Sequence, residues 1–236
     1  MPSSRSKRDQ ILQVATESFG ENGYDATMLV DIAAAVGIGT TALYHYFESK
    51  LHCLFVVMGD GLSTFRADFD RITGEHDEFL IALSALLRSS YELTDHEVLR
   101  NRLIVAEQGL LGIPRTSRRE EEARRLARSR IRDIQLAWSA FLLRGMEQGL
   151  VPEADPRLLA RGVLGLYSSV WQWYRPRAAI SLDEVAAFFV PRQLALLGLP
   201  PEVAGANVGE DAGRIDSPTG HRATKEDMRW QSVQRS

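Results

Sequence analysis

The chain has 236 residues, of which 44% are hydrophobic and 25% are charged, and its formal net charge is −3. This composition is typical of a water-soluble globular protein. No apolar run approaches the roughly 20 residues that a membrane-spanning helix needs. The single cysteine, Cys53, excludes an intramolecular disulfide and favours a reducing compartment. Because the N-terminal segment is charged and no apolar segment follows it, we expect no signal peptide, no membrane partner and a cytoplasmic location.

Residues 27–50, TMLVDIAAAVGIGTTALYHYFESK, form the most informative segment. They predict two short helices around a turn at Gly37, with Thr27 as the N-cap of the first. Between the apolar positions of the second helix the side chains are small or hydrogen-bonding, so that face can approach another polymer closely. This pattern indicates a helix-turn-helix that reads DNA. The apolar positions at helical spacing are Ile32, Ala33, Val36, Ile38, Leu43 and Phe47.

This segment resembles the DNA-binding end of the TetR family of bacterial one-component repressors. Two positions depart from the family pattern: Met28 stands where a second Thr or Ser is common, and Val30 where a polar or basic residue often reaches a phosphate. The resemblance covers about the first fifty residues and implies that residues 39–46 enter a major groove. It rests on Gly23, Tyr24, Thr27, Ile32, Ala33, Gly37, Ile38, Leu43, Tyr44, Phe47 and Lys50.

The distribution of charge matters more for DNA binding than the net value. Residues 1–50 carry four Lys or Arg against six Asp or Glu, but phosphate binding depends on where the cations lie. Here they flank the predicted reading helix. We predict base-edge contacts for Thr40, Thr41 and His45. Phosphate or minor-groove contacts are predicted for Tyr44, Lys50 and the arm residues Arg5, Lys7 and Arg8, and Thr27 and Gly39 complete the predicted DNA-binding set.

Beyond Lys50 the pattern is helical almost throughout, without a useful β alternation. The predicted fold class is therefore all-α and TetR-like, with a helix-turn-helix head (residues 1–50) on a larger helical ligand-binding and dimerisation body (residues 51–199). Residues 200–236 are rich in Pro, Gly, Asp, Ser and Thr, which predicts a disordered tail.

Several residues predict where helices begin, end or pair. Ser49 is a predicted N-cap, and Ser181 with Glu184 forms a predicted capping box. Pro191 is expected to kink or break the last helix. Two helices within residues 155–197 are expected to form a four-helix interface in a homodimer.

The body is rich in aromatic side chains, and apolar walls with a few polar groups are typical of a ligand pocket. Residues 170–176, VWQWYRP, also resemble actinobacterial TetR regulators of steroid and fatty-acid breakdown, some of which respond to acyl-CoA thioesters. The resemblance implies a hydrophobic effector with an anionic handle at Arg175 and at the arginine run near Arg124. The predicted lining is Phe65, Gln108, Gln135, Trp138, Tyr167, Trp171, Trp173 and Arg175.

Purely structural roles for the same residues stay open. Each aromatic residue can be ordinary core, and Arg175 can be a cation that complements a helix end. The arginine run can be a solvated helix face with i,i+4 pairs such as Glu120–Arg124 and Glu121–Arg125.

No motif of catalysis is present, since the sequence has no GxxxxGK[ST], HExxH or CxxC. His45, His52 and Cys53 are close in sequence, but they fall on two predicted helices, so no metal is expected. We therefore predict a homodimeric repressor, without cofactor or enzymatic activity, that binds a double-stranded DNA operator. A hydrophobic small-molecule effector such as an acyl-CoA would release it. The alternatives are a ligand-binding protein that no longer binds an operator, a transcriptional activator, and an α-helical enzyme.

Overall fold

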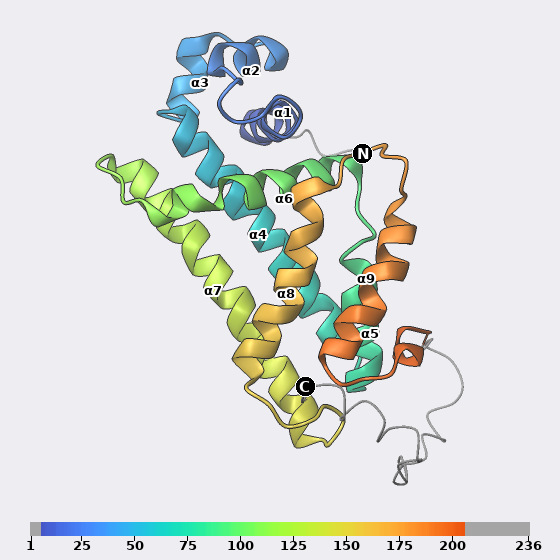
Figure 1. The fold of residues 1–236 in the computed structure, drawn as a ribbon. Helices are drawn as coiled ribbons and strands as arrows, with labels where there is room; N and C mark the ends of the chain where they lie inside the picture. Colours follow the sequence, from blue (N-terminus) through green and yellow to red (C-terminus); the bar gives the residue numbers. More distant parts are fainter. Residues whose placement is uncertain (1–5, 206–236) are drawn as a thin grey trace, which may run out of the picture. The chain divides into compact units, whose positions relative to one another are not determined.

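The computed structural model describes residues 6–205, so Arg5 and most of the predicted tail lie outside the described part. Within residues 6–205 every regular element is a helix (Figure 1), which confirms the all-α prediction. No helix of this range combines the length and apolar character needed to cross a membrane. The elements are α1 (Lys7–Asn22), α2 (Leu29–Val36), α3 (Thr40–Tyr46), α4 (Lys50–Glu75), α5 (Phe79–Ser89), α6 (Asp95–Glu107), the 3-10 helix η1 (Gln108–Gly112), α7 (Arg118–Glu147), α8 (Pro156–Trp173), α9 (Leu182–Leu196) and η2 (Pro201–Gly205).

The head consists of α1, α2 and α3 around one small core. Ile11 of α1, Ile32 of α2 and Leu43 of α3 are completely buried. Phe47, the residue that follows α3, is also buried. Between α2 and α3 the chain turns at Gly37, whose φ of 70° lies in the left-handed region that favours glycine. The predicted helix-turn-helix is therefore present, with its turn where the glycine indicated.

Thr27 does not cap α2, because the helix begins one residue later, after Met28, and has no side-chain cap. Thr27 is buried, and its hydroxyl donates to the Ser18 carbonyl at 2.9 Å and to the Gly23 carbonyl at 2.8 Å. The prediction that Thr27 is an N-cap at the DNA surface is wrong, since the hydroxyl holds the loop after α1 instead.

The body is built around α4, which leads out of the head and packs along α7, while α8 packs on α7 and α6 (Figure 1). Two predicted caps, at Ser49 and at Ser181, are confirmed. The Ser49 hydroxyl accepts from the His52 N–H at the start of α4, and Asp155 caps α8. Ser181 and Glu184 form the predicted capping box of α9.

Two predictions near the C-terminus are corrected. The last helix, α9, continues through Pro191 to Leu196, so of the predicted kink or break the break does not occur; Val190 and Leu194 on either side of the proline are buried. Residues 201–205, which were predicted to belong to a disordered tail, form η2 and pack on the body: Val203 is buried and the Ser84 hydroxyl donates to the Ala204 carbonyl at 3.3 Å.

Candidate nucleic-acid interface and internal cavity

The reading helix α3 is anchored on one side and open on the other. Leu43 is buried in the head core, whereas Thr41, Tyr44 and His45 are exposed. Thr40 is half-buried at the first position of the helix. Gly39 precedes it, with no atom within 4 Å of the place where a Cβ would stand. All of these predicted DNA-binding residues therefore lie on one short helix whose outer face is free.

The N-terminal arm is only partly described. Lys7 is exposed and donates to Gln10 at 3.0 Å within its own helix. Arg8 is also exposed, and its guanidinium lies 3.9 Å from the Asp60 carboxylate and 5.9 Å from the centre of the Phe47 ring. Arg8 therefore lies between the head and α4. Arg5 lies outside the described residues.

Lys50 is bonded to backbone carbonyls of the head. Its ammonium group donates to the carbonyls of Tyr24 at 2.8 Å, Asp25 at 3.1 Å and Thr27 at 3.1 Å. It also lies 4.4 Å from the centre of the Tyr24 ring. An ammonium has three donors, and these contacts use all of them. The predicted phosphate contact is therefore corrected: Lys50 closes the loop between α1 and α2.

A cavity of about 400 Å³ lies between α4, α6, α7 and α8. Five of the predicted ligand residues line it: Phe65, Gln108, Gln135, Tyr167 and Trp171. Other lining residues were not predicted from the sequence, because whether a helix position faces a cavity, the packed core or the surface depends on how the helices pack. These residues include Gly61, Asn101, Ile131, Ile134, Arg161, Gly165 and Ser168.

Tyr167 organises the inner wall of this cavity. Its hydroxyl accepts from the Asn101 amide at 2.9 Å. Its ring lies 5.4 Å from the rings of Phe65 and Trp171, centre to centre. Burial raises the pKa of Tyr167 far above its ordinary value, so the phenol is neutral. Among the described lining residues Arg161 is the one charged side chain, and it is exposed at the rim.

Trp138 belongs to a second cavity of about 270 Å³ rather than to the first. Phe65, Asn101 and Tyr167 line both cavities and so form the partition between them. Trp138 is buried against Phe69, with ring centres 5.4 Å apart. The assignment of Trp138 to the effector pocket is therefore corrected: it is core that borders a neighbouring space.

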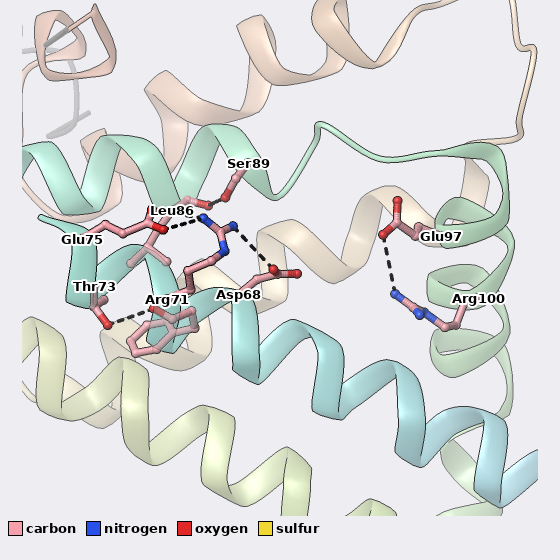
Figure 2. A network of polar contacts seen from close by, with 9 residues as sticks. Asp68, Arg71, Thr73, Glu75, Leu86, Ser89, Glu97 and Arg100 are labelled. Atoms are coloured by element: carbon pink, nitrogen blue, oxygen red, sulfur yellow. Dashed lines mark hydrogen bonds and ion pairs between the residues drawn. The ribbon is translucent and has the colours of Figure 1, made fainter. Parts of the chain in front are cut away.

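Charged residues of α4 and α6 line this second cavity, and Figure 2 shows the ion pairs that they form. Arg71 of α4 lies between Asp68, at 3.5 Å, and Glu75, at 3.1 Å. On α6, Glu97 and Arg100 are 4.0 Å apart. Because each of these cations already has a carboxylate partner, the second cavity offers less to an anion than the rim at Arg161 does.

Trp173 and Arg175 lie away from the main cavity. Trp173 is 48% exposed. The Arg175 guanidinium donates to the carbonyls of Trp173 and Tyr174, both at 3.3 Å, just beyond the end of α8. Carbonyls at a helix end attract a cation, so the alternative interpretation of Arg175 is the correct one. The predicted ligand contacts of both residues are corrected.

Three residues of the arginine run pair with glutamates within α7. Arg118 pairs with Glu122 at 2.7 Å, and Arg125 pairs with Glu121 at 2.6 Å, as a solvated helix face requires. Arg124 differs, because it is buried and pairs with Glu121 at 2.7 Å rather than with Glu120. Arg124 is therefore a structural residue and is not part of a basic rim.

An exposed reading helix held by a buried leucine, next to a turn at a left-handed glycine, defines a helix-turn-helix DNA-binding protein. Two family models match the chain. "Bacterial regulatory proteins, tetR family" matches residues 11–57, and "Tetracyclin repressor-like, C-terminal domain" matches residues 102–198. The chain belongs to the TetR family.

Several relatives share most of their length with this chain. The HTH-type transcriptional repressor KstR2 of Mycolicibacterium smegmatis is 28% identical over 189 residues, which cover 76% of this chain and 85% of KstR2. The solved ketosteroid transcriptional regulator KstR2 of Mycobacterium tuberculosis has a TM-score of 0.65 at 25% identity, covering 83% of this chain and 95% of that one. AibR, solved with isovaleryl coenzyme A and operator DNA, has a TM-score of 0.64 at 22% identity, covering 83% and 99%, and shows the shared fold.

Proposed function

We propose that this protein is a repressor that binds operator DNA through α3 and releases it when a hydrophobic anionic molecule fills the main cavity. The observation that carries the proposal is the cavity itself, whose wall combines aliphatic and aromatic side chains with uncharged polar ones and has a single charged lining residue, Arg161, among the described residues. The repressor direction is supported by the KstR2 relatives, which are named transcriptional repressors.

Sequence preference is assigned to the open face of α3. Thr40, Thr41 and His45 are the proposed base-edge contacts, because hydroxyl and imidazole groups can donate to or accept from base edges in a major groove. Tyr44, which is 49% exposed, is proposed to serve a phosphate together with Lys7 and Arg8.

The proposed effector is an acyl-CoA thioester. A cavity of about 400 Å³ is within the usual range for a small-molecule site, which is roughly 300–1,000 Å³. The acyl chain would lie against Phe65, Tyr167 and Trp171, and the anionic CoA portion would extend past Arg161 at the rim. AibR, which has the same fold, was solved with an acyl-CoA and operator DNA, so a protein of this fold can accommodate both.

The proposed homodimer uses α8 and α9. Large apolar side chains are exposed on these helices, with Leu158 at 64%, Phe188 at 52% and Leu196 at 41%. Such side chains favour burial against a second copy. Two heads fixed by one interface would then reach successive major grooves, as operator-binding dimers do.

The deciding experiment measures release from DNA. An operator duplex selected from random DNA by the wild-type protein is titrated with acyl-CoAs of increasing chain length. A coupling of about 1–3 kcal/mol would weaken DNA binding roughly 5- to 150-fold. Arg161→Ala should weaken acyl-CoA binding, whereas the matched Arg175→Ala should not. Release by neutral hydrophobes but not by acyl-CoAs would contradict the proposed effector. Absence of any salt-dependent duplex binding would favour a ligand-binding protein without an operator.

A further inference from the structure

The first turn of α7 lies against the end of the reading helix. The Arg119 guanidinium donates to the carbonyl of Tyr46, the last residue of α3, with Nη2 2.9 Å from the oxygen. Two residues before Arg119, the Ser117 hydroxyl donates to the Glu48 carboxylate. The body therefore contacts the head through side chains that α7 places at its own beginning.

Ser49 makes a third contact and joins it to α4. Its hydroxyl donates to the Glu120 carboxylate at 2.5 Å and accepts from the His52 N–H at 2.9 Å. The same hydroxyl thus caps α4 and ties the turn between α3 and α4 to α7. Three elements meet at this hydroxyl, so a shift of α7 cannot leave the end of α3 undisturbed.

The beginning of α7 is itself held firmly. The Glu121 carboxylate accepts from two nitrogens of Arg124, both at 2.7 Å, and from the Arg115 backbone N–H at 3.0 Å. Arg124 in turn donates to the Leu111 carbonyl at 2.6 Å. Hydrogen bonds from Arg124 and Arg115 hold the pKa of Glu121 far below its usual range. The first turn of α7 is therefore fixed to η1, where Leu111 lies.

Both η1 and α7 also contribute residues to the wall of the main cavity. From η1 comes Gln108, and from α7 come Ile131, Ile134 and Gln135. A molecule in the cavity therefore touches the two elements whose junction holds the end of α3.

We infer that Ser117, Arg119 and Glu120, with their partners Tyr46, Glu48 and Ser49, form a junction that positions the reading helix for its operator and transmits the state of the cavity to it. We name this set the α7 junction. Its members act through the end of α3 and are positioning residues, while the base-edge contacts stay with Thr40, Thr41 and His45. The role of the junction in transmitting the state of the cavity rests on the proposed function, whereas its role in positioning the reading helix does not.

The first test compares two neighbouring arginines in the full-length protein. Arg119→Ala removes the bond to Tyr46, whereas Arg118→Ala removes the same charge but only a pair with Glu122 inside α7. Without any effector, Arg119→Ala should weaken binding to the selected duplex roughly 2- to 10-fold. It should also speed amide exchange at Phe47, whose N–H bonds the Leu43 carbonyl at 3.0 Å. Arg118→Ala should change neither. Equal losses in both variants, or no change in Arg119→Ala, would overturn the positioning role.

A rescue series separates hydrogen bonding from charge. Glu120→Ala removes the acceptor for Ser49, whereas Glu120→Gln keeps a carbonyl oxygen in its place. Operator affinity should fall in the alanine variant and return to within about twofold of wild type in the glutamine variant. Glu122→Ala, which pairs only with Arg118, is the control for lost negative charge. A glutamine variant as weak as the alanine variant would overturn the junction, because charge alone would then explain the loss.

The effector comparison uses decanoyl-CoA on wild type and Arg119→Ala. Both should bind decanoyl-CoA equally by calorimetry, but the factor by which it weakens DNA binding should fall toward one in Arg119→Ala. If decanoyl-CoA weakens DNA binding by the same factor in Arg119→Ala as in wild type, the junction does not transmit the state of the cavity. If decanoyl-CoA and the other acyl-CoAs neither bind wild type nor release its DNA, the proposed function fails, while the effector-free comparison still decides whether the junction positions the reading helix.

Discussion

At the scale of single residues, the loop between α1 and α2 depends on one ammonium group. Lys50 donates to three backbone carbonyls, of Tyr24, Asp25 and Thr27. Without it these carbonyls lose a charged partner at the base of the helix-turn-helix. Burial, followed by the nearby Glu107 carboxylate, raises the pKa of Tyr24 to about 12, so the ring under the ammonium is a neutral phenol.

Lys50→Ala should therefore destabilise the protein rather than weaken phosphate binding. Hydrogen bonds to charged groups contribute about 1.5–3 kcal/mol, and since Lys50 is only half-buried we expect a total loss of about 1–3 kcal/mol. Urea unfolding measures it, with the exposed Lys7→Ala as the matched control. The slope of DNA affinity against salt should stay at its wild-type value in Lys50→Ala. If the salt slope of Lys50→Ala falls by about one unit while its stability is unchanged, Lys50 contacts a phosphate after all.

Residue-scale specificity belongs to α3. Replacing Thr41 or His45 by alanine should relax discrimination at one base pair per half-site by about 1–3 kcal/mol, because each exposed side chain can hydrogen-bond a base edge. Competition binding with single-base variants of the selected duplex measures this change. Tyr44→Phe should weaken all sequences alike. A uniform loss in the Thr41 and His45 variants would count against base reading.

At the scale of elements, helices approach closely where glycine faces an aromatic ring. Gly145 on α7 is buried, and a Cβ there would lie 2.3 Å from Cζ of Phe79 on α5. Phe79 also stacks on Phe141, with ring centres 4.7 Å apart. The ring of Phe79 therefore lies against two residues of α7, Gly145 and Phe141, and α7 has no room for a methyl group at position 145.

Gly145→Ala should destabilise the body by about 1–3 kcal/mol through overpacking. The added methyl group would displace the Phe79 ring, and that displacement disturbs its stacking on Phe141. Thermal or urea unfolding measures the loss. Gly74→Ala on α4 is the matched control, because no atom lies within 4 Å of its Cβ position, and alanine there should stabilise by roughly 0.5–1 kcal/mol. Equal effects in the two variants would contradict the close packing of α5 on α7.

At the scale of the whole molecule, two histidines lie where the head meets the body. Burial, followed by the Arg119 charge, lowers the pKa of His52 at the start of α4. Burial, followed by the Arg100 charge, lowers the pKa of His96, which faces Glu17 of α1. In both cases the folded state binds the proton less readily than the unfolded state does.

Folding stability should therefore be fully present above pH 6.5, the ordinary histidine value, and fall as the pH drops below it. Each histidine contributes a slope of at most about 1.4 kcal/mol per pH unit. Urea unfolding at pH 7.5 and pH 5.5 measures the loss, and the double variant His52→Gln, His96→Gln should reduce it. The exposed His45→Gln controls for the substitution itself. A pH dependence of equal size in the double variant would place its origin in other groups.

Local chemistry was enough for the sequence to determine the all-α class, the helix-turn-helix and the starts of α4 and α9. A serine cap at Ser49, a capping box at Ser181 and a glycine turn at Gly37 depend on neighbours within four residues, so the linear sequence contains them. The exposed residues of α3 follow in the same way, because a single buried position, Leu43, fixes which face of a short helix is outward.

Only the tertiary structure decided which side chains share a space. Lys50 and Thr27 bond carbonyls that packing brings close, and Arg161 reaches the cavity while Trp173 and Arg175 do not. Arg119 and Tyr46 are far apart in the chain, so no periodicity could pair them. The physical reason is that helical spacing fixes the face a residue occupies, whereas the partner of that face depends on how separate helices pack.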